Sequence, residues 1–221
     1  MSKVNIGKKI LNANQEYAFK NRRLLHEKKK LCLNMISSPG SGKTTILAAT
    51  ILELKGKLKI GVIEGDIQTD LDAERIRATK APAVQINTDG ACHLSAAQVT
   101  RALDQLPIDD LDVVIIENVG NLVCPSAFEL GESHKIVVLS VAEGDDKPVK
   151  YPAIFARSKV LLINKIDLIN AGADFDTEKV KTDARRLNKD IEIFEISAKT
   201  GQGMTNWCNW LTETTGTLSG S

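Results

Sequence analysis

The sequence has no apolar run long enough to cross a lipid bilayer, and its N-terminus lacks the uninterrupted apolar stretch of a secretory signal. It contains only four cysteines in 221 residues, too few for a disulfide framework. No internal repeat is visible. The net charge is +1, with 26% charged and 43% hydrophobic residues, so the composition indicates neither disorder nor a general attraction to polyanions. We therefore expect a folded cytoplasmic protein with no nucleic-acid partner and no membrane insertion.

The charge is distributed unevenly along the chain. Residues 1–30 carry nine Lys or Arg and two acidic residues, whereas the remainder has 20 basic and 26 acidic residues. Apolar residues between positions 3 and 29 recur near one helical face. We predict a basic amphipathic helix within residues 1–30 that packs on a domain of residues 31–213, followed by a flexible tail at 214–221. A basic surface for docking an acidic partner is the alternative role of this helix.

A phosphate-binding loop is indicated at residues 37–44, Ser-Ser-Pro-Gly-Ser-Gly-Lys-Thr, between an apolar strand at 31–36 and a helix at 43–55. The N–H groups of such a loop and the start of the helix converge on phosphate oxygens. Lys43 would contact the β- and γ-phosphates, and the hydroxyl of Thr44 would bind Mg²⁺. Ser37 replaces the first glycine of the usual pattern. An ordinary glycine-rich turn between strand and helix is the alternative.

Apolar strands alternate with amphipathic helices along the whole chain, which predicts a parallel sheet covered on both faces. We therefore expect an α/β fold: a single P-loop NTPase domain with a largely parallel sheet of about seven strands. Ligands of such sheets bind at the carboxyl ends of the strands. The predicted strands are 31–36, 59–66, 83–87, 112–120, 135–141, 159–164 and 191–196. The predicted helices after the phosphate loop lie near 94–106, 149–157, 176–189 and 203–212, and a polar loop from residue 67 leads into a short helix that reaches residue 76.

Two further motifs indicate recognition of guanine. Asn164-Lys165-Ile166-Asp167 follows a strand, and Asp167 can accept hydrogen bonds from the N1–H and N2–H₂ groups that adenine does not present in this arrangement. The stem of Lys165 can cover the base, and Asn164 would brace the loop. Ser197-Ala198-Lys199 follows the last strand and would support the base through backbone N–H groups.

Carboxylates at strand ends complete a predicted magnesium site, because Mg²⁺ prefers oxygen ligands. Asp66 and Glu117 each end a buried strand and would join Thr44 as ligands. Gly120 is placed to sense a γ-phosphate through its amide. Asp72 lies in the predicted first switch loop, where an acid could position the attacking water, although helix capping is an equal alternative for it.

Cysteine and histidine side chains form a second candidate metal site. Cys92-His93 and Cys124 lie on loops that follow strands, and thiolate and imidazole suit nickel and zinc better than magnesium. Three ligands per chain leave a tetrahedral site incomplete, so a two-fold dimer that pools its ligands would close it. A buried cysteine beside a loop histidine is the alternative. Cys32 and Cys208 lie on apolar faces and are predicted to be core residues.

With these motifs assembled, the chain resembles the HypB family, the GTPases that help deliver nickel to NiFe-hydrogenase during its maturation. The resemblance rests on the phosphate loop, E-G-D at 64–66, D-A-E-R-I at 72–76, A-C-H-L at 91–94, I-E-N-V-G-N-L-V-C-P at 116–125, E-G-D-D at 143–146, N-K-I-D at 164–167 and S-A-K at 197–199.

The resemblance implies slow, regulatory, Mg²⁺-dependent hydrolysis of GTP to GDP and a nickel or zinc site at a homodimer interface that nucleotide promotes. It also implies a HypA-type nickel metallochaperone and the hydrogenase large-subunit precursor as partners. The expected catalytic residues are Lys43, Asp66, Asp72, Glu117 and Gly120. The expected nucleotide-binding residues are Pro39, Gly40, Ser41, Gly42, Lys43, Thr44, Thr45, Asn164, Lys165, Asp167, Ser197, Ala198 and Lys199. The expected metal ligands are Cys92, His93 and Cys124 for nickel or zinc, and Thr44, Asp66 and Glu117 for magnesium.

One departure and two alternatives accompany this interpretation. Bacterial members of the family often carry an N-terminal Cys-rich motif or His-rich tract that holds nickel, but residues 1–30 contain no cysteine and only His26, so we do not expect high-affinity nickel storage there. A urease-type nickel-insertion GTPase is one alternative, although such proteins use a Cys-Pro-His triplet where this chain has Cys124-Pro125-Ser126. A structural, metal-bridged GTP-binding dimer is the other.

Overall fold

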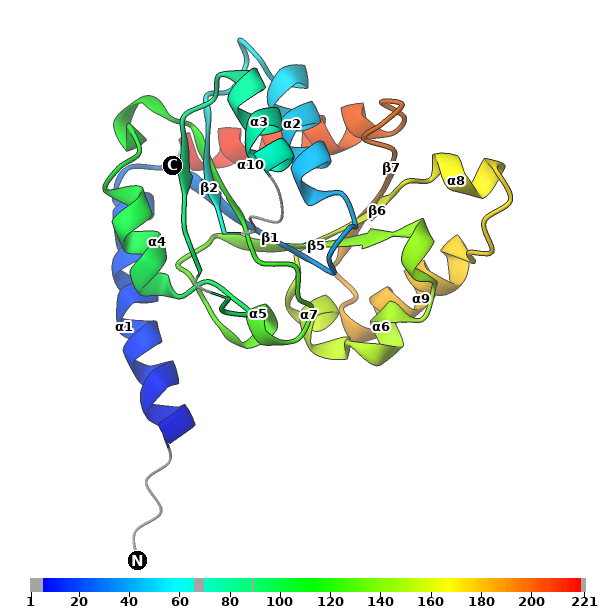
Figure 1. The fold of residues 1–221 in the computed structure, drawn as a ribbon, viewed down its shortest axis with the longest axis horizontal. Coiled ribbons are helices and arrows are strands. Elements are labelled where there is room, and N and C mark those ends of the chain that lie inside the picture. Colours follow the sequence, from blue (N-terminus) through cyan, green and yellow to red (C-terminus); the bar gives the residue numbers. More distant parts are fainter. Residues whose placement is uncertain (1–5, 66–69, 89, 220–221) are drawn as a thin grey trace, which may run out of the picture.

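The computed structural model describes residues 6–65, 70–88 and 90–219, and seven strands in this part of the chain form one sheet (Figure 1). The strand order is β3-β2-β4-β1-β5-β6-β7, and every neighbouring pair is parallel. The strands are β1 Leu31–Ser37, β2 Ile60–Glu64, β3 Ala83–Gln85, β4 Val113–Glu117, β5 His134–Ser140, β6 Val160–Asn164 and β7 Glu192–Ile196. The predicted α/β fold with about seven strands is therefore confirmed.

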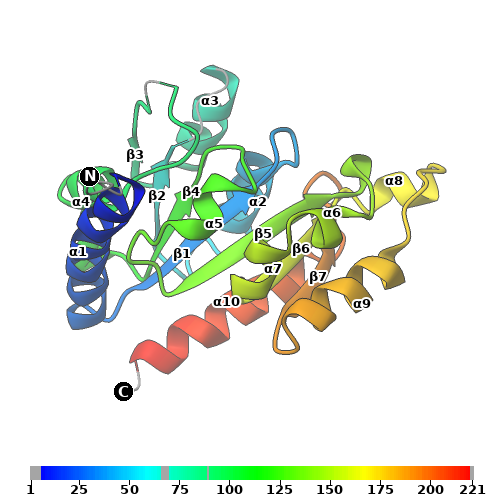
Figure 2. The ribbon, with the colours of Figure 1, turned by 90° about the horizontal axis from the view of Figure 1, so that it is seen from below.

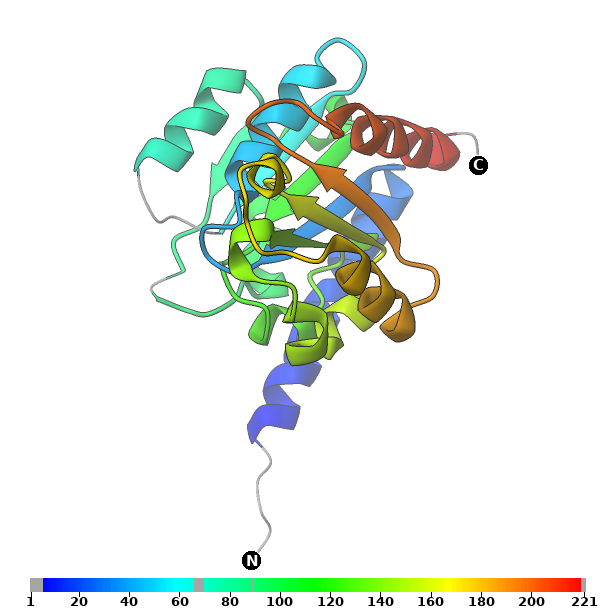
Figure 3. The same cartoon turned by 90° about the vertical axis from the view of Figure 1, so that its right-hand side faces the viewer.

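Helices cover both faces of this sheet (Figures 1 and 3). Helices α2, α3 and α10 lie on one face; α4 with α1, and α7 with α9, lie on the other. The helices are α1 Ile6–Glu27, α2 Lys43–Glu53, α3 Asp70–Thr79, α4 Ala96–Leu103, α5 Cys124–Ala127, α6 Lys147–Lys150, α7 Pro152–Arg157, α8 Asp167–Asn170, α9 Thr177–Leu187 and α10 Met204–Ser219, with short 3₁₀ turns at Ile108–Asp110 and Val141–Glu143. No helix in the described ranges is both long and apolar enough to span a membrane.

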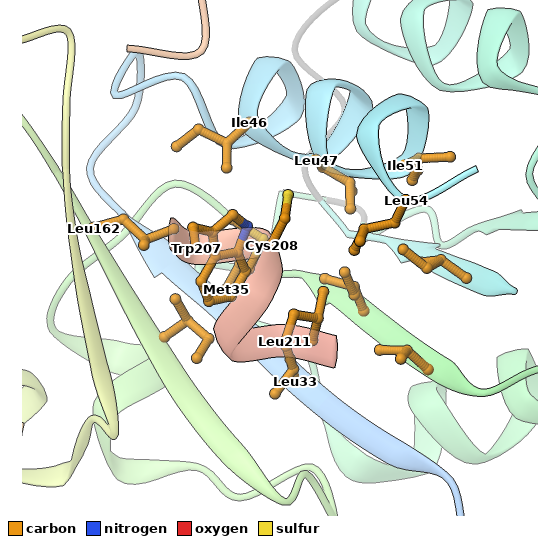
Figure 4. Packing of buried hydrophobic residues seen from close by; sticks show 14 of the residues in the cluster. Leu33, Met35, Ile46, Leu47, Ile51, Leu54, Leu162, Trp207, Cys208 and Leu211 are labelled. Atoms are coloured by element: carbon orange, nitrogen blue, oxygen red, sulfur yellow. The ribbon is translucent and has the colours of Figure 1, made fainter. Parts of the chain in front are cut away.

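The central strand β1 is buried along its whole length, which explains its nearly continuous apolar sequence. Leu33 and Met35 face α2 and α10, where Trp207 is fully buried (Figure 4). Each such side chain contributes about 1.5–3 kcal/mol by leaving water. Cys32 packs in the cluster on the opposite face, and Cys208 of α10 is also buried, so the prediction that both are core residues is confirmed.

The structure differs from two expectations about helices. The predicted helix at 149–157 is divided into α6 and α7, because proline disfavours a helical conformation in the residue before it, and Tyr151 precedes Pro152 with φ of −126°. The expected flexible tail from residue 214 is wrong over 214–219, where α10 continues to Ser219. Thr215 is buried and donates to the Leu211 carbonyl, and Leu218 packs on the core.

Helix α1 lies beside α4 at one end of the sheet, as Figures 1 and 2 both show. Ala18 and Leu25 are buried in this contact region, whereas Tyr17 and Phe19 are exposed. The same buried face carries Asn14 and Asn21, and the basic residues Lys20, Arg22 and Arg23 are exposed.

Candidate functional site

The predicted phosphate loop connects β1 to α2, as the motif requires. Gly40 and Gly42 both have positive φ, 76° and 95°, which side chains other than glycine rarely adopt. A Cβ at Gly42 would also lie 2.6 Å from the amide nitrogen of Asn164. The loop therefore needs glycine at 42 both for its turn and for its contact with residues 164–167, which are predicted to recognise the base and are called the base-recognition loop below.

Ser37, which replaces a glycine of the usual pattern, is part of the loop's hydrogen bonding. Its hydroxyl accepts a bond from the Lys43 ammonium at 2.9 Å and one from the Ser41 hydroxyl, and it donates to the Ser38 carbonyl. Ser37 and Ser41 are fully buried. The sequence motif gave no signal for this role, because the pattern counts Ser37 only as a mismatch.

The residues predicted to bind guanine, except Ser197, line one cavity of about 360 Å³, a volume typical of small-ligand sites. Asn164 donates to the Ser41 carbonyl at 2.9 Å and accepts from the Ala198 N–H at 3.2 Å, so it ties three loops together. The Ser197 hydroxyl donates to Asp167 at 2.7 Å and orients that carboxylate. The cavity is lined by Gly42, Thr45, Asn164, Lys165, Asp167, Leu168, Ala198 and Lys199.

Lys165 joins the base-recognition loop to the phosphate loop. Its ammonium donates to the Gly40 carbonyl at 2.8 Å, so its stem runs along the wall of the cavity. Its φ of +64° is uncommon for a residue with a side chain, and such conformations persist where surrounding contacts fix them. Figure 3 shows the start of α2 and the neighbouring α8 at this edge of the sheet.

Two of the predicted magnesium ligands are in direct contact. The Thr44 hydroxyl donates to the Glu117 carboxylate at 2.7 Å, where α2 begins and β4 ends. Gly120 packs against Pro39 of the phosphate loop, and a Cβ there would lie 3.0 Å from the proline ring. Asp66 lies outside the described residues. Asp72 lies in α3, and its side chain is likewise outside the described part.

The predicted thiol and imidazole ligands come together. One ligand atom from each of Cys92, His93 and Cys124 can be chosen so that all lie within 4.8 Å of one another. The Cys92 thiol and His93 Nδ1 are 3.3 Å apart. Cys92 is exposed and the other two are half-buried, so the group is accessible from solvent. This arrangement offers three ligands of a type that nickel and zinc favour.

The surroundings of Cys92 and His93 act on their protonation in opposite directions. A hydrogen bond with Cys124, followed by burial, raises the pKa of Cys92, so its thiol is protonated at neutral pH. Burial lowers the pKa of His93, so its imidazole is neutral and has a free lone pair. A metal that binds here would therefore displace a proton from the Cys92 thiol but none from the His93 imidazole.

Phe128 is a neighbour of this cluster that sequence reasoning missed. Its ring lies on the imidazole of His93, with centroids 3.9 Å apart and planes inclined by 32°. The Phe128 carbonyl accepts a bond from the buried Lys135 ammonium at 2.7 Å. A single aromatic residue in a loop has no spacing pattern that could have identified it.

The segment after β4 connects the two candidate sites. Asn118, which follows Glu117, accepts a bond from the Leu94 N–H at 3.2 Å, next to His93. Asn121, which follows Gly120, donates to the Cys92 carbonyl at 3.3 Å and accepts from the Val123 N–H at 2.8 Å. Residues 117–121 therefore contact Thr44, the phosphate loop and the two loops that carry Cys92, His93 and Cys124.

Comparisons with known proteins agree with this geometry. A protein-family profile described as "CobW/HypB/UreG, nucleotide-binding domain" matches residues 32–195. "Hydrogenase maturation factor HypB" of Escherichia coli K12 is 52% identical over 202 residues, which cover 91% of this chain and 69% of that protein. The crystal structure of HypB from Archaeoglobus fulgidus is 38% identical with a TM-score of 0.87, covering 93% of this chain and 100% of that one. The crystal structure of HypB from Helicobacter pylori in complex with nickel is 39% identical with a TM-score of 0.85, covering 92% and 95%.

Proposed function

The chain belongs to the HypB family of hydrogenase maturation factors, and from this we propose that it is a slow, Mg²⁺-dependent GTPase that supports nickel insertion into NiFe-hydrogenase. In this proposal, GTP and metal each favour a homodimer, and hydrolysis changes the metal site. The observation that carries the proposal is the segment 117–121, which bonds to both candidate sites.

Particular side chains bind GTP and Mg²⁺ in the proposed function. Lys43 and the N–H groups of the phosphate loop bind the phosphates, and Asp167 binds the guanine edge. The adjacent oxygens of Thr44 and Glu117 suit Mg²⁺, which when bound neutralises charge on the phosphates. Gly120, against Pro39, offers an amide beside the phosphate loop. Asp66 is the further proposed ligand, and Asp72 the proposed residue that positions water.

In the proposed function, nickel is an ion that the protein carries and hands on. A structure of a relative from Helicobacter pylori is described as a complex with nickel, and the same residue types cluster here as Cys92, His93 and Cys124. Three ligands per chain are completed when a second copy contributes its own. Zinc, which accepts the same ligands, is the competing metal. The proposed partners are a HypA-type nickel metallochaperone and the hydrogenase large-subunit precursor.

The experiment that tests this function measures nickel affinity and solution mass with GDP and with a non-hydrolysable GTP analogue. We expect the two nucleotides to give different nickel affinities, and the analogue and Ni²⁺ each to promote the dimer. The double variant Cys92→Ala/Cys124→Ala should lose the effect of metal and keep that of nucleotide. Equal nickel affinity with both nucleotides would instead favour a structural, metal-bridged dimer, because a ligand shifts only equilibria between states that it binds differently.

A urease-type insertion GTPase is the second candidate function. It is favoured by one observation: the Helicobacter pylori relative, 41% identical over 214 residues, is described as a "Hydrogenase/urease maturation factor". Adding the protein with GTP and nickel to the apo forms of hydrogenase large subunit and of urease distinguishes the two. Activation of hydrogenase alone is the result that our proposal predicts.

A further inference from the structure

Both loops that carry the thiol and imidazole ligands are bonded to helix α1. Asn14 of α1 accepts a hydrogen bond from the Ala96 N–H at 2.8 Å and donates one to the Glu129 carbonyl at 2.7 Å. Ala96 follows Cys92-His93 at the start of α4, and Glu129 follows the Cys124 helix α5. The amide of a single side chain therefore spans the two segments, and Asn14 is only 8% exposed.

Asn21 repeats this arrangement two turns further along α1. Its amide nitrogen donates to the carbonyls of Ala96 at 3.0 Å and Leu130 at 2.8 Å, and its oxygen accepts from the Thr100 hydroxyl at 2.7 Å. Asn21 is 1% exposed. The segment also lies close to the helix, since a Cβ at Gly131 would be 2.5 Å from that of Asn21. Asn21 therefore joins the start of α4 to the segment after α5, as Asn14 does.

The bonded backbone groups of Ala96 and Glu129, here called the anchors, are joined to the ligands by short, packed segments. Between His93 and Ala96, Leu94 is fully buried and its N–H is bonded to Asn118. On the other side, Phe128 precedes the bonded Glu129 carbonyl, and its ring lies on His93. A shift of either anchor would therefore move a ligand or the ring that packs on it.

We propose that Asn14 and Asn21 are positioning residues that set the separation of Cys92 and His93 from Cys124, so that the N-terminal helix holds the metal site in its binding geometry. The inference extends the proposed function, but the arrangement of the loops is a property of the protein without metal. Loss of such indirect support typically lowers metal affinity by roughly 10–100-fold. We expect a loss near tenfold for Asn14→Ala, because Asn21 still joins the segments.

The test measures the proximity of the two thiols directly, in the full-length protein without metal. In buffers of reduced and oxidised glutathione, the equilibrium constant for a disulfide between Cys92 and Cys124 reports the effective concentration of one thiol at the other. Cys32 and Cys208 are buried and do not compete. For Asn14→Ala we expect this constant and the Ni²⁺ affinity each to fall about tenfold, and the charge-transfer and d–d bands of bound Co²⁺ to change.

Matched variants separate positioning from stability. Thr50→Val removes a buried hydrogen bond from the Trp207 indole on the far face of the sheet, and Arg22→Gln removes a surface ion pair between α1 and Glu129. Neither should change the thiol equilibrium. If Asn14→Ala fails to fold, Asn14→Asp keeps an acceptor for the Ala96 N–H and replaces the donor to the Glu129 carbonyl with a carboxylate oxygen, so the thiol equilibrium constant should again fall.

The outcomes separate the positioning role of Asn14 from the proposed nickel function. If Thr50→Val and Asn14→Ala change the thiol equilibrium equally, the positioning role is overturned. If Asn14→Ala alone lowers the thiol equilibrium but the wild-type protein does not bind Ni²⁺, the positioning role stands and the proposed nickel function is wrong. If the wild-type protein binds Ni²⁺ and Asn14→Ala alters neither measurement, the positioning role is wrong and the proposed nickel function stands.

Discussion

The nucleotide-binding loops and the metal-binding loops are held in place in different ways. The nucleotide-binding loops bond to each other, as Asn164 does to Ser41 and Lys165 to Gly40. The metal-binding loops, besides contacts among the ligands, are held by side chains from α1 and from the segment 117–121. A site whose loops fix one another keeps its shape when its surroundings change. A site held by other elements can be altered through them, which is the property that the proposed coupling of nucleotide to metal binding needs.

The largest effect that we predict affects the nucleotide site alone. Asp167→Asn should invert the preference from guanosine to xanthosine triphosphate and weaken GTP binding on the order of 10³-fold, because the N1–H and N2–H₂ groups of guanine lose their acceptor. Nickel affinity in the absence of nucleotide should stay the same. Titration with fluorescent analogues of both nucleotides measures the change. An unchanged GTP affinity would remove Asp167 from the base site.

A smaller effect should appear at the metal site alone. Phe128→Ala removes the ring that packs on His93, so the imidazole becomes free to rotate and Ni²⁺ affinity should fall about tenfold. GTP affinity should not change. Competition with a chromophoric chelator measures the nickel affinity. Val149→Ala, which truncates an apolar side chain that is 65% exposed on α6, is the control and should bind nickel as the wild type does.

Acid should destabilise the protein through Glu132, whose partner Lys135 bonds to the Phe128 carbonyl beside the metal ligands. Burial alone would raise the pKa of Glu132, but Lys135 and hydrogen bonds from Lys135, the Leu130 N–H and Asn34 lower it below its ordinary value of 4.5. A lowered pKa in the folded state stabilises the protein fully above about pH 4.5, and this stabilisation is lost as the pH falls through the folded-state pKa.

Urea unfolding of wild type and Glu132→Gln between pH 7 and pH 3 checks this prediction. The wild type should be more stable by a constant amount at higher pH, and the difference should narrow below about pH 4.5 as Glu132 becomes protonated. Parallel stability curves across this range would show that the carboxylate does not contribute through its charge. Nucleotide affinity above pH 5 should be the same in both proteins.

Whether loops bond to each other or are held by distant elements also explains which residues the sequence could predict. Short motifs located the nucleotide-binding loops, since glycines and Asn-Lys-x-Asp are selected by local backbone and ligand chemistry. They also located Cys92, His93 and Cys124, because these residue types are rare and chemically distinctive. Asn14 and Asn21 could not be found in this way, because their partners lie far along the chain. Asparagine in a helix has no spacing pattern that indicates a distant partner.

The sequence also failed to predict which polar residues are buried, as Asn34 and the segment after residue 213 show. Asn34 in the strand Leu31–Ser37 is fully buried and donates to Glu132, but within an apolar run it gave no sign of a polar network. The residues after 213 are small and polar, which favoured a tail, yet Thr215 bonds to the helix backbone and Leu218 packs on the core. Composition describes what a segment contains, whereas the neighbours that it packs against decide its structure.

The smallest effect that we predict concerns the phosphate loop at the position where it departs from the usual pattern. Ser37→Gly removes the hydroxyl that bonds to Lys43 and Ser41, so stability should fall by about 1 kcal/mol. GTP affinity should change less than about threefold, because the Lys43 bond to phosphate replaces its bond to Ser37. Ser37→Ala separates loss of the hydroxyl from the added backbone freedom of glycine. A loss of GTP affinity tenfold or greater in both variants would mean that Ser37 belongs to the binding machinery and that the loop depends on its surroundings as the metal site does.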